Sequence, residues 1–255
     1  MPIWFVLLNA YVVGGFFCHT LHCCIHDFMH FCGGCNMTIN KVLAVICNIP
    51  MGLPSAISFG KYHADHHNFL NETRRDPDLP LPWESKLSYD YPFYKYVFYA
   101  IIEFFYALRP IFMHKPSMRM DEALNYIFIF TSDYLIYHYW GLGAFLYIII
   151  SGCSSIGPHP AAIHIIAEHY EFIKGQETYD YIGWWNIPNL NLGYHLEHHD
   201  FPTCPWWNLR KIREIAPEYY EYLPYHTNYW KVLKNFLGDK NFNLYYRTIR
   251  IPEKP

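Results

Sequence analysis

The sequence predicts an all-α integral membrane fold, with a few transmembrane helices topped by a cytosolic helical cap that is rich in histidine. Hydrophobic residues fill 52% of the 255 positions and charged residues only 16%, and several apolar runs approach the length of a membrane span. Tyrosine (24) and tryptophan (8) are abundant, and such amphipathic rings favour the membrane interface. Three histidine clusters lie at or beyond the ends of the apolar runs, which places them in the cap.

The first two apolar runs differ in their interruptions. Residues 3–24 have the length that a transmembrane helix needs. Residues 42–59 contain Pro50, Gly52 and Pro54, which interrupt a helix within membrane depth. We therefore expect the first run to cross the membrane and the second to form a re-entrant or interfacial segment.

The later apolar segments predict a helical hairpin. Residues 123–140 and 142–156 are joined at Gly141, which favours a turn between two crossings. Residues 93–112 are aromatic-rich and are expected to lie along the membrane interface. The chain is thus predicted to cross the membrane three times and to end in a soluble tail.

The histidine clusters have the spacing of residues that share one face of a helix. Imidazole is the commonest metal ligand in proteins, and it binds as the neutral base. Eight rings are too many for one metal ion and suit two ions, provided that the fold brings the clusters together. The eight residues are His26 and His30, then His63, His66 and His67, and finally His195, His198 and His199.

A ninth ligand is available between the second and third clusters. His164 and His169 are five residues apart, which rotates them roughly 140° from each other on a helix, so both cannot easily face one site. We choose His169 and keep His164 as the alternative. Asp27, Asp65 and Glu197 are expected to accept the second N–H group of a ligating ring, unless they belong to a solvated helix face.

A pair of histidine-rich shells with few carboxylates favours a redox metal that keeps open positions for dioxygen. Zinc fits less well, because a structural site takes four ligands and a catalytic site three plus water. Two iron ions would use all the rings, and such a centre can activate O2 and remove hydrogen from an unactivated C–H bond. In a membrane the most obvious substrate with such a bond is an acyl chain. We predict no catalytic residues beyond the metal ligands and no separate cofactor-binding residues.

The orientation follows from the requirement that the clusters meet. All three must lie on one side of the membrane, together with Lys61, Arg74, Arg75 and Lys174, and the positive-inside rule makes that side cytosolic. The net charge is −3 and no basic block is present, so nucleic acid is not an expected partner.

The three motifs HDxxH, HxxHH and HxxHH resemble the histidine boxes of the membrane fatty-acid desaturase superfamily. The flanking segments are similar to the sphingolipid delta-4 desaturases, also called dihydroceramide desaturases. These segments are residues 57–67, 105–110, 166–170, 175–179, 193–202 and 212–220. The resemblance implies the same nine histidines as ligands, with His169 in the position of the superfamily's additional histidine.

The resemblance also implies an activity. The family converts dihydroceramide to ceramide by introducing a trans double bond between C4 and C5 of the sphingoid base. It uses two iron ions, O2 and electrons that reach it from NADH through a reductase and cytochrome b5. The expected location is the endoplasmic reticulum membrane, as a multi-pass protein. No haem motif of a fused cytochrome b5 domain is found, so the electron donor is expected to be a separate protein.

Two departures from the family pattern stand out, and several functions stay open. Asp27 replaces the usual glutamate of the first box, and residues 1–255 are expected to form a single desaturase domain that lacks the family's N-terminal segment and first transmembrane helix. A C4-hydroxylase or a bifunctional desaturase/hydroxylase is the main alternative, because both reactions begin with the same hydrogen abstraction. A metal transporter is disfavoured by the position of the boxes, and a non-catalytic relative by their completeness.

Overall fold

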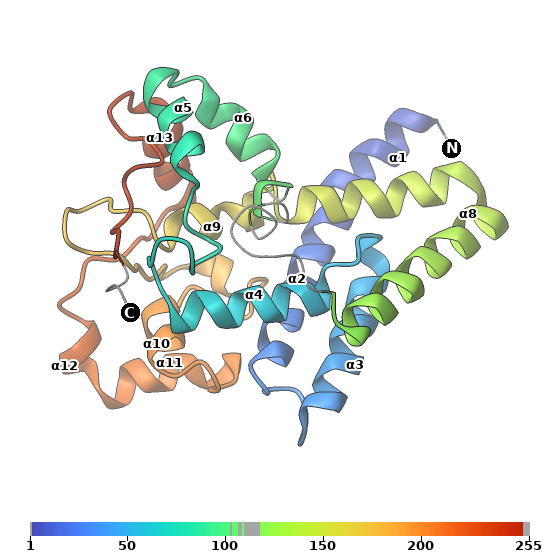
Figure 1. The fold of residues 1–255 in the computed structure, drawn as a ribbon, viewed down its shortest axis with the longest axis horizontal. Coiled ribbons are helices and arrows are strands. Elements are labelled where there is room, and N and C mark those ends of the chain that lie inside the picture. Colours follow the sequence, from blue (N-terminus) through green and yellow to red (C-terminus); the bar gives the residue numbers. More distant parts are fainter. Residues whose placement is uncertain (1, 103, 107–108, 110–117, 252–255) are drawn as a thin grey trace.

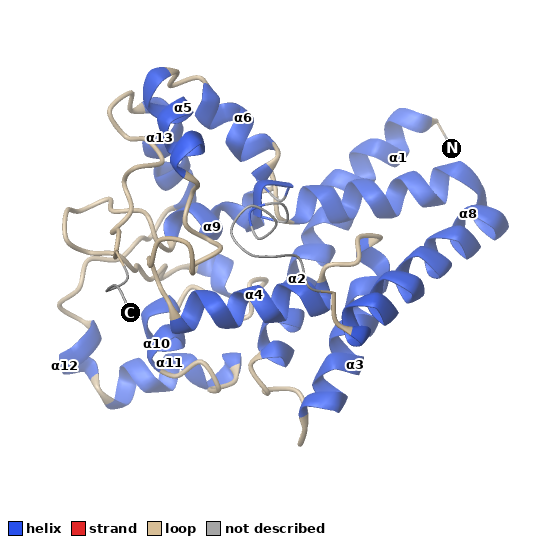
Figure 2. Cartoon of the chain, viewed as in Figure 1, coloured by secondary structure: helices blue, strands red, loops and turns tan. Residues whose placement is uncertain are grey.

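In the part of the chain that the computed structural model describes, residues 2–102, 104–106, 109 and 118–251, helices are joined by loops and no strand is present (Figure 2). Residues 3–29 and 120–155 form long helical arms, which we call the membrane arms and which extend to the right in Figure 1. Residues 69–102 and 156–251 gather mainly on the left, and we call them the cap. The first half contains α1 (Ile3–Asn9), π-helical η1 (Ala10–Gly14), α2 (Gly15–Met29), α3 (Met37–Asn48), 3-10 helix η2 (Ile49–Met51), α4 (Ala56–Asn68), α5 (Pro82–Asp90) and α6 (Tyr94–Ala100). The second half contains α8 (Met120–Ser155), η3 (Pro160–Ile163), α9 (His164–Ala167), η4 (Trp184–Asn186), α10 (His195–Asp200), α11 (Trp206–Ile215), α12 (Pro217–Tyr220) and α13 (Tyr229–Gly238).

Within the described residues, two helical segments are long and apolar enough to cross a membrane. They are Ile3–Met29 and Met120–Ala167, and each leaves large apolar side chains exposed, such as Trp4 and Ile127. An apolar surface of this kind is favourable against lipid. The predicted first crossing is therefore confirmed as a helix of sufficient length and composition.

Helix α8 is a hairpin of two arms that meet at Gly141 (Figure 1). Gly141 has φ 80° and ψ −178°, a conformation that residues with a Cβ atom rarely adopt, and the chain reverses there. The second arm returns alongside α1 and α2. The two arms and Ile3–Met29 supply the three apolar arms that the sequence predicts.

The interrupted segment forms a sharp bend between α3 and α4. The helical stretches Met37–Met51 and Ala56–Asn68 meet at 116° and together pass as one broken or re-entrant span. Asn48 stabilises the bend, because its Oδ1 atom accepts hydrogen bonds from the backbone N–H groups of Ser55 (3.1 Å) and Ala56 (3.2 Å). The interruption is confirmed, whereas the re-entrant path through a membrane stays a prediction.

The cap has its own core of aromatic and aliphatic side chains. Phe98 of α6, Ile163 of η3, Tyr170 and Phe236 of α13 are all buried in it. This core joins elements from the middle and the end of the sequence. Of the aromatic-rich stretch 93–112, residues 103, 107–108 and 110–112 lie outside the described residues, so its predicted interfacial path is not decided.

Candidate metal centre

All nine histidines that the sequence singles out come together where the membrane arms meet the cap. His26 lies in the last turn of α2 and His30 at its C-terminal end, while the second cluster occupies the last two turns of α4. His169 follows α9, and the third cluster forms most of α10. The three predicted boxes are therefore on helices and near one another, as their spacing indicates.

The rings form two groups. In the first, the ligand atoms of five histidines lie within 4.8 Å of one another; these are His26, His30, His63, His67 and His198. The Nε2 atom of His67 lies 3.1 Å from Nε2 of His63 and 3.0 Å from Nε2 of His198.

In the second group, His66, His169 and His199 have their ligand atoms within 4.8 Å of one another. His195 joins them, since its Nε2 atom lies 2.9 Å from that of His169 and 3.2 Å from that of His199. The two groups adjoin, because the rings of His67 and His199 stack with their centroids 4.3 Å apart.

The division follows from helix geometry. Side chains four residues apart on a helix lie one above the other. His63 and His67 accordingly meet in the first group, and His195 and His199 meet in the second. The remaining ring of each of these boxes points to the other group, so each box contributes to both.

The distances between nitrogen atoms fit metal coordination. Two nitrogens that bind one ion at about 2.1 Å and at right angles lie about 3.0 Å apart. The Nε2–Nε2 distances in the two groups are 2.9–3.2 Å. The buried Nε2 atoms of His26 and His30 have no hydrogen-bond partner, which is a costly arrangement unless they bind something else.

Three of the rings are in the protonation state that metal binding needs. Burial lowers the pKa of His169, His198 and His199 well below the ordinary value, and neighbouring imidazoles lower it further. These rings are therefore neutral at pH 7 and present a lone pair.

Three carboxylates lie beside the rings on their outer side. The Nδ1 atom of His66 faces Asp76 at 2.9 Å and Asp78 at 3.7 Å, which leaves Nε2 of His66 to point toward His169. Glu168 lies 3.6 Å from Nδ1 of His195. Such contacts fix the tautomer and orientation of a ligating ring.

The carboxylates predicted for this role do something else. Asp27 accepts a hydrogen bond from the backbone N–H of Trp206 (3.2 Å), and Glu197 pairs with Arg213 (3.1 Å). Asp65 forms no hydrogen bond with a histidine among the described residues. This expectation is wrong, because a residue next to a ligand on a helix points away from the ligand's face.

His164 lies outside both groups. Its Nδ1 atom is 2.5 Å from Oε1 of Glu168, and its buried Nε2 atom has no hydrogen-bond partner. The 140° rotation expected between His164 and His169 is consistent with this arrangement. The geometry thus favours His169 as the ninth ring.

The third box is anchored by a buried charged cluster. Asp180 accepts a hydrogen bond from the backbone N–H of Leu196 (2.8 Å), and Arg213 contacts both Asp180 (2.5 Å) and Glu197 (3.1 Å). Burial and the neighbouring Asp180 raise the pKa of Glu197 to about 8. Two carboxyl groups therefore share one arginine here.

Helical membrane arms that support two adjoining groups of buried and half-buried imidazoles define a class of histidine-rich, metal-dependent membrane oxidoreductases. A family model described as "Fatty acid desaturase" matches residues 2–230. The chain belongs to the fatty acid desaturase family, and it is a membrane protein and an oxidoreductase.

Several curated proteins are similar to most of the chain. "Sphingolipid delta(4)-desaturase/C4-monooxygenase DES2" of Bos taurus is 41% identical over 244 residues, which are 95% of this chain and 75% of the relative. The Homo sapiens protein of the same name is 40% identical over 248 residues, 96% of this chain and 76% of the relative. "Sphingolipid delta(4)-desaturase DES1" of Homo sapiens is 37% identical over 247 residues, again 96% and 76%.

Proposed function

We propose that this protein is a sphingolipid delta-4 desaturase that converts dihydroceramide to ceramide. The observation that supports the proposal most strongly is the pair of adjoining histidine groups at the junction of the membrane arms and the cap. The relatives described above match nearly the whole length of this chain, and each is named as a sphingolipid desaturase. A lipid substrate also suits a site that lies beside apolar helices.

The nine histidines would hold two iron ions, five rings around one and four around the other. When bound, iron supplies O2 activation and the capacity to remove hydrogen from an unactivated C–H bond of the lipid. The chain contributes the rest. Asp76 and Glu168 hold the rings of His66 and His195 in orientation.

Electrons, location and orientation complete the proposal. Electrons would come from cytochrome b5 and its NADH-dependent reductase, and the protein would lie in the endoplasmic reticulum membrane with the histidines on the cytosolic side. Arg74, Arg75 and Lys174 are exposed in the cap, and the positive-inside rule supports the cytosolic orientation of these residues.

C4 hydroxylation is the second candidate. Two of the relatives are named both as desaturases and as C4-monooxygenases. Both outcomes begin with removal of the same hydrogen, so the ligand set cannot distinguish them. The protein could also perform both reactions.

The deciding experiment is lipid analysis of a host that lacks sphingolipid desaturase and expresses this chain. We expect a product two hydrogens lighter than dihydroceramide for desaturation, or one oxygen heavier for hydroxylation. The purified protein should contain about two iron ions per chain. Full iron loading without either product would overturn the proposed substrate, and absence of iron would overturn the metal assignment.

A further inference from the structure

Asp133 is a carboxyl group buried within a membrane arm. It lies in the first arm of α8, is 6% exposed, and forms no hydrogen bond with any described residue. Its Oδ1 atom is buried without a partner. An unpaired polar group in such surroundings costs free energy and usually marks a functional position.

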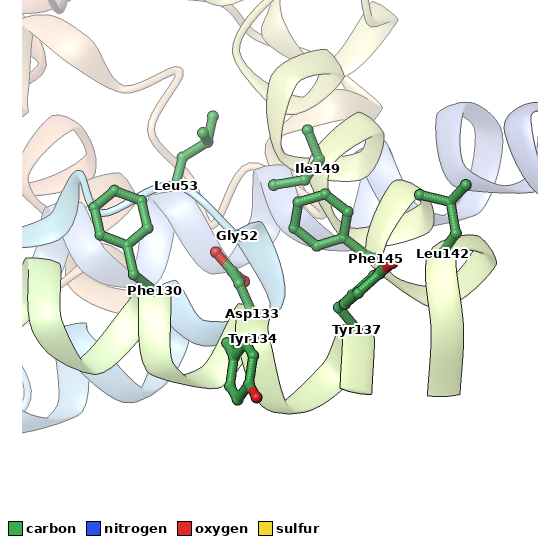
Figure 3. Close-up of a pocket in the computed structure, with 9 residues that line it drawn as sticks. All are labelled: Gly52, Leu53, Phe130, Asp133, Tyr134, Tyr137, Leu142, Phe145 and Ile149. Carbon is green, nitrogen blue, oxygen red and sulfur yellow. The ribbon is translucent and has the colours of Figure 1, made fainter. Parts of the chain in front are cut away.

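A pocket lies next to this carboxyl group. It has a volume of about 470 Å³ and opens between the two arms of α8 and the Gly52 turn that links α3 and α4. Figure 3 shows Asp133 rising from its arm toward this turn, with Phe130 on one side and Phe145 on the other. The wall is otherwise apolar or aromatic, and Asp133 is the only carboxyl group among the described residues that line it.

Exposed side chains line the open side of the pocket. Tyr134 and Leu142, one on each arm, line the pocket and are exposed on a helical segment that is long and apolar enough to cross a membrane. The bound molecule therefore comes from the lipid phase. Its hydrocarbon would pack against Phe145 and Ile149, as in other small-molecule sites with apolar walls and one or two polar groups.

The carboxyl group selects among lipids by hydrogen bonding. An oxygen of Asp133 accepts a hydrogen bond whether the group is ionised or protonated. Phosphatidylcholine offers ester and phosphate oxygens, which are acceptors, and no N–H or O–H donor. An N-acyl sphingoid base has an amide N–H and hydroxyl groups. Only the second kind of lipid satisfies the unpartnered oxygen in either protonation state.

We propose that the pocket between the α8 arms binds an N-acyl sphingoid lipid, which donates a hydrogen bond from its amide or hydroxyl group to Asp133. The choice of lipid rests on the proposed function. The pocket is separate from the histidine groups, because none of its lining residues is one of the nine rings. It is a recognition site for the membrane lipid, distinct from the place where the lipid is oxidised.

Photolabelling tests this site without any turnover. The full chain in lipid nanodiscs, with no electron donor, is irradiated with N-acyl sphinganine that carries a diazirine in its acyl chain. Labelled peptides are identified by mass spectrometry. We expect label on the α8 arms, and a loss of about threefold to tenfold in Asp133→Leu, which is the value of one hydrogen bond.

Two controls separate recognition from folding. Ser132→Ala removes a neighbouring hydroxyl that already bonds the carbonyl of Phe128, and it should label like the unaltered protein. Asp133→Asn keeps an accepting oxygen at nearly the same volume and should retain more label than Asp133→Leu. Iron content and a single peak on size exclusion show that each variant is folded.

A second measurement uses the unaltered protein only, in case Asp133→Leu does not fold. A diazirine phosphatidylcholine at the same concentration should label the arms several-fold less than the sphinganine probe. Equal labelling by the two lipids, or equal labelling of a folded Asp133→Leu, overturns the site. Neither outcome depends on catalysis, so failure of the desaturase proposal would leave this result standing, and the reverse also holds.

Discussion

The Nδ1 atom of His66 lies 2.9 Å from the Oδ1 atom of Asp76, and both side chains are almost completely buried. Asp76 is held in turn by the backbone N–H of Asn71 (2.7 Å). Burial alone would raise the pKa of Asp76, but His66 and Arg247 hold it below its ordinary value. The carboxylate is therefore charged and fixed, which suits it to orient a metal ligand.

Replacement of this carboxylate should weaken metal binding without unfolding the protein. We expect Asp76→Asn to lower iron affinity about 10–100-fold, because the ring of His66 loses the acceptor that fixes its tautomer. Iron retained after dialysis against graded chelator measures the effect. Asp90→Asn, which breaks only the exposed pair with Lys86, should retain iron normally. Equal retention by the two variants would show that Asp76 does not act on the metal.

The C-terminal strap, residues 243–250, should contribute to the same site. Arg247 donates two hydrogen bonds to Asn71 Oδ1 (3.3 and 3.2 Å) and lies 4.0 Å from Asp76. Arg247→Ala leaves these buried groups unpaired and should cost about 2 kcal/mol of stability. Thermal unfolding in detergent measures it. Arg247→Lys should restore part of the lost stability. An unchanged melting temperature in Arg247→Ala would contradict this role.

The choice between His164 and His169 can be tested directly. His169→Ala should remove iron from the group of four rings and abolish lipid oxidation, because His169 contacts three other rings of that group. His164→Ala should keep its iron, since its ring faces Glu168 instead. Elemental analysis of both purified variants separates the two. Iron loss from His164→Ala alone would reverse the assignment.

Close packing of α8 against η2 predicts a strong effect at one glycine. A Cβ atom at Gly152 would lie 1.9 Å from the carbonyl oxygen of Met51, so the two backbones would have to separate. Gly152→Ala should therefore destabilise the protein by about 1–3 kcal/mol. Gly143→Ala on the same hairpin meets no atom within 4 Å and should be neutral or stabilising. Similar melting temperatures for the two variants would disprove the close contact.

The ion pair between Arg250 and Glu177, which anchors the C-terminal strap, should contribute a pH-dependent amount to stability. Arg250 binds both oxygens of Glu177 at 2.7 Å. Burial alone would raise the pKa of Glu177, but hydrogen bonds from Arg250 and Asn71 hold it below its ordinary value of 4.5. The pair therefore stabilises the fold above pH 4.5, and its contribution is lost as the pH falls through the lowered pKa.

Glu177→Gln should accordingly lower stability by less than about 1 kcal/mol at pH 7, since the pair is partly exposed. The difference from the unaltered protein should stay constant down to about pH 5 and shrink below it. Melting temperatures across this range measure the difference. A gap that widens on acidification would contradict the assigned direction of the pKa shift.

The helices and the meeting of the three boxes could be predicted, because the spacing of the histidines and the apolar runs indicate both. The spacing of His63, His66 and His67 predicted one shared face, and the division of this box between two groups was not foreseen. Pro50 and Gly141 indicate where helices must break or turn. Such features need no knowledge of distant contacts.

The groups that orient the rings could not be predicted in this way. Asp76 reaches His66 through a loop, and Arg247 reaches Asn71 across 176 positions of sequence. Proximity in the sequence suggested Asp27 and Glu197 instead, although neighbours on a helix diverge. Two sequence features could have indicated the carboxylates that orient the rings. They are the acidic loop after the second box, with Asp76 and Asp78, and Glu168 directly before His169.

The sharing of boxes between the two histidine groups has a mechanical consequence. Because α4 presents His63 and His67 to one group and His66 to the other, a rotation of this helix shifts the ligands of both at once. The same holds for α10 with His198 on one side and His195 and His199 on the other. A movement of α4 or α10 would therefore be felt at both proposed metal positions, whereas a change at His26, His30 or His169 would act on one position alone.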